Sequence, residues 1–398
     1  MPRGTIIIIA AILVPLLWYV SPGYSAFHSG GVGSCNGCHS GGHGSEDGLP
    51  LTTNSSIPLL RGSDPSSVCL NCHAGTGSSL APSVLTFDGS ALTPGGDFYW
   101  LTKTFIWAEG SSSATSHGHN VVAQDFGLSA DLNKIQGPGG NYPSDQLSCI
   151  SCHDPHGRSR GGTAAGAQAI SVSGSYGDLP VPGTSSGNYR LLGDEHYVVN
   201  GFSFNNPAPI ARQNSILPFA ESDSSHVDYG SGMSSWCGNC HATIVGQGHQ
   251  GHLSETSSFR HSTDGSLGAR FVSSYNTYVN SGDLNGGFAT AYLQFVPFER
   301  GSSDAQLLDP TSTQGMDSSS RINCLSCHRA HASAFTAAGR WDFNADLLVD
   351  SHPAPGDSGA TATDVVNSYY GRDIASEFGI NQGPFCEKCH AGGSGMGM

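Results

Sequence analysis

The segment Cys149-Ile-Ser-Cys152-His153-Asp-Pro-His156 decides how this chain of 398 residues is built. It joins a pair of cysteines, three positions apart, to an adjoining histidine, and the same Cys-x-x-Cys-His pattern occurs six times. The six motifs use all twelve cysteines of the chain and are Cys35/Cys38/His39, Cys69/Cys72/His73, Cys149/Cys152/His153, Cys237/Cys240/His241, Cys324/Cys327/His328 and Cys386/Cys389/His390. No cysteine is left over for a disulfide or for a separate thiolate site.

Cys-x-x-Cys-His is the attachment signature of c-type haem. Each thiol adds across a vinyl group of the porphyrin, and the histidine binds the iron from one side. Zinc ribbons and redox dithiols also use Cys-x-x-Cys pairs, but neither needs a histidine at one fixed offset. Histidine accounts for only 18 of 398 residues, so chance does not place it after all six pairs. The sequence therefore predicts six covalently attached haem c groups, held by the twelve cysteines and ligated by the six motif histidines.

The N-terminus has the three parts of a secretory signal peptide. Arg3 precedes an apolar run from Ile6 to Val20, and a short polar segment follows it. This run is shorter than the roughly 20 residues that a membrane-spanning helix needs. Export agrees with the motifs, because haem is attached to c-type cytochromes outside the bacterial cytoplasm.

The cleavage site stays open between two positions. Small residues at Gly23 and Ser25 favour cleavage after Ser25, whereas cleavage after Ala26 would place a tyrosine at the −3 position. We expect residues 1–26 to be the signal peptide and 27–398 to form a single hexahaem domain with no membrane span.

Composition predicts the fold class and excludes one kind of partner. The formal charge is −15 and only 16 residues are lysine or arginine, which argues against nucleic-acid binding. Glycine is 55 of 398 residues, about twice the usual share, so we expect mostly coil with short α-helices and little β-structure. In such a multihaem cytochrome c fold, organised around six haems, the cofactors would supply the apolar core. We expect helices at Thr363–Tyr370, Leu267–Val279 and Ala289–Phe295, and surface loops at Gly110–Ser116, Gly161–Gly187 and Gly301–Ser320.

The second axial ligand of each iron decides whether a haem carries electrons or binds a substrate. Only two methionines, Met233 and Met316, lie inside the chain, and two cannot serve six irons. Twelve histidines lie outside the motifs: His28, His43, His117, His119, His156, His196, His226, His249, His252, His261, His331 and His352. Six bis-histidine haems would use half of them, and such irons work by gaining and losing an electron.

Spacing ranks some of these histidines above others. His156 and His331 lie three residues beyond a motif histidine, so each points away from its own haem and towards a neighbouring iron. His43, four residues after a motif histidine, and His28, just before the first motif, are further candidates. Two competitions stay open on spacing alone: His119 competes with His117, and His261 competes with His249 and His252.

The chain resembles the OmcS-type hexahaem outer-surface c-type cytochromes of metal-reducing bacteria, which polymerise into cytochrome nanowires. The resemblance covers nearly all of the mature chain and is carried by Ala26–Val32, Leu92–Phe98, Gly118–Ala123, Cys149–Gly157, Trp236–His241, Asn323–Ala332 and Tyr369–Arg372, together with the number and order of the motifs. It implies six bis-histidine haems in one continuous chain of stacked and T-shaped pairs. The distal ligands that it implies are His28, His43, His119, His156, His261 and His331.

In this family a histidine just after the first motif leaves its own subunit and ligates a haem of the next one. His43 is the residue at that place, at an offset of four residues from His39 where the family has three. The resemblance therefore implies a homopolymer with His43 as the ligand donated to a neighbouring subunit.

Three functions compete on the sequence. The first is long-range extracellular electron transfer by a filament at the outer cell surface, with redox partner proteins at the outer membrane and with metal oxides or other cells as acceptors. The second is a monomeric electron shuttle, periplasmic or secreted. The third is enzymatic, a multihaem reductase of a small oxyanion such as nitrite, which needs an open or lysine-ligated iron. No Cys-x-x-Cys-Lys motif exists and the histidines suffice to close all six irons, so we expect an electron-transfer protein rather than an enzyme.

Overall fold

The structure is a computed structural model that describes residues 38, 60–75, 82–155, 189–214, 220–245, 263, 265, 267–277, 285–380, 385–386 and 388–389. The predicted signal peptide (1–26) and the predicted loop Gly161–Gly187 lie outside this part of the chain. The predicted site residues that also lie outside it are His28, Cys35, His39, His43, His156, His261 and His390. His249 and His252, the competitors of His261, are likewise outside.

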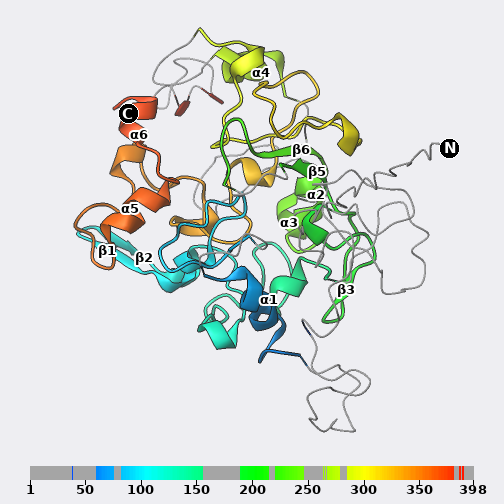
Figure 1. Cartoon of the computed structure of the whole chain (residues 1–398), viewed down its shortest axis with the longest axis vertical. Coiled ribbons are helices and arrows are strands. Elements are labelled where there is room, and N and C mark those ends of the chain that lie inside the picture. The colour runs from blue at the N-terminus through cyan, green and yellow to red at the C-terminus, as the bar shows by residue number, and fades with distance from the viewer. Residues whose placement is uncertain are drawn as a thin grey trace, which may run out of the picture.

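Most of the described chain is coil interrupted by short elements (Figure 1). The α-helices are α1 (Pro65–His73), α2 (Met233–Cys237), α3 (Ala242–Val245), α4 (Ala269–Thr277), α5 (Ala362–Ser368) and α6 (Ile374–Phe378). Single turns of 3-10 helix are η2 (Phe98–Thr102), η3 (Ala114–Ser116), η4 (Gln124–Phe126), η5 (Ser144–Gln146), η6 (Cys149–Ser151), η7 (Tyr189–Leu191), η8 (Phe288–Thr290), η9 (Ala305–Leu307), η10 (Cys324–Ser326), η11 (Thr336–Ala338) and η12 (Leu348–Asp350). The predicted fold class is confirmed.

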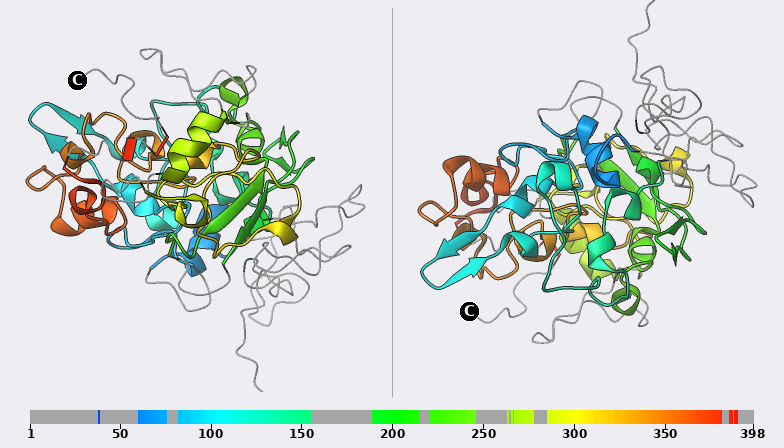
Figure 2. Two further views of the ribbon diagram at one scale, coloured as in Figure 1. Left: turned by 90° about the horizontal axis from the view of Figure 1, so that it is seen from above. Right: turned by 90° about the horizontal axis from the view of Figure 1, so that it is seen from below.

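The β-structure consists of two-stranded antiparallel ribbons. Their strands are β1 (Phe105–Trp107) with β2 (Gly110–Ser112), β3 (Val198–Val199) with β4 (Phe202–Ser203), and β5 (Ile210–Gln213) with β6 (Val227–Ser231). The β1–β2 ribbon lies beside α5 at one end of the body, and β3–β4 lies towards the other end (Figure 2). In the part of the chain that the structure describes, no helix combines the length and the apolar character that a membrane crossing requires.

An aromatic cluster forms the largest apolar core of the described residues. It gathers side chains from Leu70 near the start of the described chain to Phe385 near its end. Phe295 lies at its centre, with ring centroids 5.1 Å from Phe385, 6.0 Å from Phe378 and 5.7 Å from Tyr369. The chain therefore contributes an aromatic core of its own beside the apolar surface that the haems are expected to supply.

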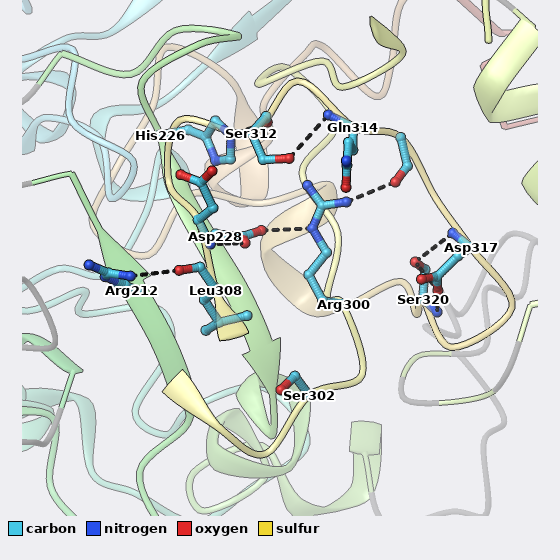
Figure 3. Close-up of polar contacts among 12 residues, drawn as sticks. Arg212, His226, Asp228, Arg300, Ser302, Leu308, Ser312, Gln314, Asp317 and Ser320 are labelled. Atoms are coloured by element: carbon cyan, nitrogen blue, oxygen red, sulfur yellow. Dashed lines mark hydrogen bonds and ion pairs between the residues drawn. The ribbon is translucent and has the colours of Figure 1, made fainter. Parts of the chain in front are cut away.

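The segment Gly301–Ser320 is mostly coil at the surface, as predicted, and it is anchored at several points. Arg300, which precedes it, donates from Nε to Oδ1 of Asp228 in β6 at 2.8 Å (Figure 3). Leu308 is 2% exposed, and its carbonyl accepts from Nη1 of Arg212 in β5 at 2.9 Å. These polar contacts hold the segment against the β5–β6 ribbon. By contrast, the predicted loop Gly110–Ser116 begins as strand β2 and continues into η3.

Helix α5 confirms the predicted helix at Thr363–Tyr370, and part of its buried face is polar. Thr361 and Asp364 cap its start reciprocally, and the helix ends at Ser368. Asp364 is buried and pairs with Lys103 at 2.8 Å, whereas Val366 is 56% exposed. The helix therefore buries a paired carboxylate as well as apolar surface.

The other two predicted helices had different outcomes. Leu267–Val279 contains α4, which covers Ala269–Thr277. The helix predicted at Ala289–Phe295 is wrong, because only the single turn η8 forms there and the chain beyond it is buried on every side. A segment without an exposed face has no amphipathic period, so the apolar spacing at these positions carried no helical signal.

A buried ion triad connects the centre of the molecule to the motif at Cys324. Glu221 accepts from Nη1 of Arg329 at 2.8 Å and from Nη1 of Arg340 at 3.2 Å, and all three side chains are buried. Burial alone would raise the pKa of Glu221, but the two guanidinium groups hold it below its usual value. Glu221 is therefore a carboxylate at neutral pH, and the triad has one uncompensated positive charge.

Glu221→Gln tests this triad, because the change leaves two buried guanidinium groups without an anion. We expect a loss of about 3–5 kcal/mol in the free energy of unfolding at neutral pH, measured with urea. Since the folded-state pKa of Glu221 lies below its usual 4.5, its contribution is present above that pH and is lost as the pH falls below it. The free energy of unfolding of the variant should therefore fall less than that of the wild-type protein as the pH is lowered below 4.5. The control Glu195→Gln changes a side chain that is 53% exposed, and an equal effect there would contradict the assignment.

Phe295→Ala tests the aromatic core. Phe295 is 2% exposed among other rings, so truncation removes buried apolar surface and leaves a cavity, at a cost of about 3–5 kcal/mol in the free energy of unfolding. The matched control is Phe87→Ala, which changes a ring that is 83% exposed and should alter stability by no more than about 0.5 kcal/mol. Equal losses from both variants would show that Phe295 is not a core residue.

Candidate haem-binding sites

Three of the Cys-x-x-Cys-His motifs fold into a common helical turn. In the motif at Cys149, the carbonyl of the first cysteine accepts from the amides of Cys152 at 3.2 Å and His153 at 2.9 Å. The motifs at Cys237 and Cys324 repeat both bonds, at 3.0–3.3 Å. Residues three and four positions apart share one face of such a turn, so both thiols and the imidazole can reach one ring.

The structure describes a single residue of the first motif, and the second motif has an exposed cysteine. Cys38 is the one described residue of the first motif; it is partly buried, and its carbonyl accepts from the amide of Arg61 at 2.9 Å. Cys72 lies in α1 and is exposed, whereas the other described motif cysteines are at least partly buried. The chain by itself therefore does not enclose the thiol of Cys72, which a covalently attached porphyrin would cover. Haem attachment at Cys38 and Cys72 stays a prediction from the motif pattern.

The sixth motif is described through its two cysteines. The amide of Cys389 donates to the carbonyl of Cys386 at 3.2 Å, which is the first of the two bonds of the common turn. Both cysteines are partly buried. None of the cysteines that the structure describes forms a disulfide, as the use of every cysteine in a haem motif requires.

Cys152 and Cys327 lie in surroundings that suit an uncharged sulfur better than a thiolate. Burial raises the pKa of Cys152 and of Cys327 to about 12. A thiolate is costly in such a place, whereas a thioether carries no charge. The surroundings of these two thiols therefore suit the uncharged sulfur of a haem thioether.

Each described motif histidine has its ring orientation fixed by one hydrogen bond. The Nδ1 atoms lie 2.7–2.8 Å from backbone carbonyl oxygens, in the pairs His73–Pro82, His153–Arg190, His241–Pro138 and His328–Ala337. A carbonyl only accepts, so Nδ1 must donate, and in the neutral imidazole Nε2 is then the nitrogen without a proton. This is the tautomer that an iron ligand requires.

Two predicted distal histidines lie opposite motif histidines from distant parts of the chain. The ring centroids of His119 and His241 are 6.0 Å apart, and those of His331 and His153 are 6.3 Å apart. Two imidazoles on opposite sides of one metal ion, each bound at about 2.0–2.1 Å, place their centroids a little over 6 Å apart. Both separations therefore leave room for one iron between the rings.

The distal members of these pairs are neutral. Burial lowers the pKa of His119, and it lowers that of His331 to about 3. His119 also donates from Nδ1 to the carbonyl of Ala330 at 2.6 Å, so its Nε2 is the unprotonated nitrogen. A neutral imidazole is the form that binds iron.

The structure separates His119 from its competitor His117. His117 is completely buried, with Nδ1 2.9 Å from the carbonyl of Trp100 and Nε2 3.1 Å from the hydroxyl of Ser112. Both ring nitrogens are therefore occupied by protein groups, and His117 is placed as a core residue.

The other described histidines outside the motifs have local roles. His226 stacks on Tyr292 with centroids 3.8 Å apart, and His352 stacks on Trp107 at 4.0 Å. The side chain of His196 is 83% exposed. Apart from the two pairs described above, the remaining predicted distal ligands fall outside the described residues.

Sequence reasoning missed the carbonyl groups that orient the imidazoles. The acceptors at Arg190 and Ala337 have φ angles of 48° and 55°, in the left-handed region that usually favours glycine. Neither residue is a glycine, and a carbonyl belongs to every residue type. No signal in the sequence could have identified these acceptors.

Comparison with known proteins places these sites in a family. No family model matches the chain. The C-type cytochrome OmcS of Geobacter sulfurreducens is 37% identical over 93% of this chain and 95% of its own length. A solved structure of the Outer Membrane Cytochrome S filament from Geobacter sulfurreducens matches with a TM-score of 0.72 at 35% identity, over 92% of this chain and all of that one. A second structure, of the OmcS nanowires from the same organism, matches with the same TM-score at 33% identity and the same coverage. With its six haem c motifs, the chain belongs to the OmcS family of c-type cytochromes.

Proposed function

We propose that this chain is an electron carrier that acts outside the cell, as the subunit of a filament with a continuous chain of haems. The observation that carries the proposal is the family match over nearly the whole chain, to a cytochrome whose solved structures are filaments. Six haem c groups in one chain, with imidazoles available on both sides of the irons, suit electron transfer rather than substrate binding. Terminal acceptors would be metal oxides or other cells.

The proposed irons are ligated by two histidines each. Support comes from the opposed pairs His119–His241 and His153–His331, whose ring separations fit an iron between them. The proposed distal ligands that complete the set are His28, His43, His156 and His261, which lie outside the described residues. Iron with both axial positions filled has no site for an oxyanion substrate, which argues against a reductase.

His119→Ala tests the ligand assignment, with His117→Ala as its matched control. Removal of His119 should leave the iron bound to His241 five-coordinate or water-ligated, and one haem in six should become high-spin. Low-temperature electron paramagnetic resonance of the oxidised holoprotein would measure that fraction. His117→Ala removes an equally buried imidazole and should lower stability while all haems remain low-spin. A high-spin signal in the His117 variant alone would reverse the assignment.

The proposed filament places the mature chain at the outer cell surface, after export and removal of residues 1–26. The proposed link between subunits is His43, acting on a haem of the neighbouring subunit. Redox partner proteins at the outer membrane would supply the electrons. The alternative, a monomeric shuttle in the periplasm or in the medium, requires the same haems but no link between subunits.

His43→Ala tests this link. Without the donated ligand, the secreted protein should no longer form long filaments in electron micrographs, and one iron per subunit should become high-spin. His249→Ala removes a histidine outside the proposed ligand set and should leave filaments intact. Normal filaments from the His43 variant would rule out the proposed link, and a monomeric wild-type protein would favour the shuttle.

A further inference from the structure

Motifs of two kinds alternate along the middle of the chain. The motifs at Cys69 and Cys237 share the pattern Ser-Ser-x-Cys-x-Asn-Cys-His, and each follows a serine placed three residues before its first cysteine, Ser66 and Ser234. The motifs at Cys149 and Cys324 share Cys-x-Ser-Cys-His-x-x-His instead. The chain thus contains two consecutive pairs of motifs, with one motif of each kind in each pair.

The two pairs are assembled by the same hydrogen bond. In the first pair, the amide of Cys149 donates to Oγ of Ser66 at 3.1 Å. In the second pair, the amide of Cys324 donates to Oγ of Ser234 at 3.2 Å. Both serines are completely buried. Helix α1 packs against η6 and α2 packs against η10, so each serine lies in the contact between two haem motifs.

The second motif of each pair also repeats its own backbone contacts. The amide of Gly193 donates to the carbonyl of Cys152 at 2.9 Å, and the amide of Arg340 donates to the carbonyl of Cys327 at 2.8 Å. Capping boxes precede both turns, formed by Ser148 with Ser151 and by Asn323 with Ser326. The two motif pairs therefore share these backbone contacts and capping boxes as well as the hydrogen bond to the serine.

The hydrogen bonds that Ser66 and Ser234 accept are not needed to form the helices in which these serines lie. Helix α1 is capped by Asp64, which accepts from the amide of Ser67 at 2.9 Å and from its hydroxyl at 2.8 Å. Helix α2 begins after Gly232 without a side-chain cap. The hydroxyls of Ser66 and Ser234 accept from the neighbouring motif, so they act between haem sites.

The hydrogen bonds accepted by Ser66 and Ser234 lie next to the cysteines to which two haems would attach. The amides of Cys149 and Cys324 each bond to a serine that lies three residues before the first cysteine of the other motif. The first cysteines of two different motifs therefore lie close together, and each would join a porphyrin. A shift of the Cys149 backbone would move one attachment point relative to the other. Electron tunnelling falls steeply with the distance between porphyrin edges, so this contact affects transfer directly.

We propose that Ser66 and Ser234 are positioning residues, each of which fixes the separation and orientation of the two haems in one pair. The inference rests on the c-type cytochrome assignment and does not require a filament.

Circular dichroism in the Soret region tests the proposal, because neighbouring haems produce an exciton couplet that depends on their mutual geometry. Ser66→Ala and Ser234→Ala, prepared as oxidised holoproteins, should each lose part of the couplet amplitude, and the double variant should lose more. Ser67→Ala is the matched control: it removes an equally buried hydroxyl that contacts Asp64 and the amide of Asp125 but no second motif. It should lower the urea midpoint of unfolding and leave the couplet unchanged.

Two results would overturn the proposal. One is an unchanged couplet in both serine variants with a lower unfolding midpoint, which would make the serines purely structural. The other is failure of Ser66→Ala, Ser234→Ala and the double variant to yield holoprotein, which would assign the serines to folding alone. If only Ser66→Ala fails, Ser234→Ala applies the same test to the second pair. The couplet is measured without reference to filament formation. A protein that forms no filaments would therefore contradict the proposed function and leave the proposal on the serines unaffected.

Discussion

The hydrogen bond from an imidazole Nδ1 to a backbone carbonyl is the contact on which the haem sites depend. It selects the tautomer, fixes the plane of the ring and leaves Nε2 unprotonated. The acceptor often comes from far along the chain: Pro138 serves His241 from 103 residues away, and Ala330 serves His119 from 211 residues away. A regular helix or sheet uses its carbonyls internally. A coil-rich chain leaves them available, so the abundance of glycine and serine is compatible with precise ligand placement.

The chemistry of the sites could be predicted from the sequence because it is covalent and local. Six motifs specify six haems whatever the fold around them. The distal ligands were harder to predict, since His117 and His119 are two residues apart and spacing alone cannot tell which of them binds an iron. Only the packed structure shows that the nitrogens of His117 are occupied by Trp100 and Ser112, while His119 faces His241. The missing information was the position of a partner more than a hundred residues away.

The apolar core that the chain itself forms could not be predicted from the sequence, for a related reason. Aromatic residues are only 9% of the chain and are spread along it, so no local stretch marks an apolar core. The structure gathers Phe295, Phe378 and Phe385 into contact across long coil segments. Closing such segments costs conformational entropy, especially in a chain rich in glycine. In the proposed ligation, each iron joins two distant histidines and so restricts the unfolded chain in the way that a cross-link does. Cofactor and aromatic core would then stabilise the fold together.

The paired arrangement of motifs also bears on how a filament could arise. Two equivalent units follow each other in the chain, each joined internally through a buried serine. His331 belongs to the second unit but lies opposite His153 of the first, so in the proposed ligation one unit supplies a ligand to the other within one molecule. A ligand donated from one subunit to the next, as proposed for His43, applies the same device between molecules. The proposed haem chain would then be continuous because a histidine of one motif pair ligates an iron of the other pair within the molecule, and His43 ligates an iron of the next subunit.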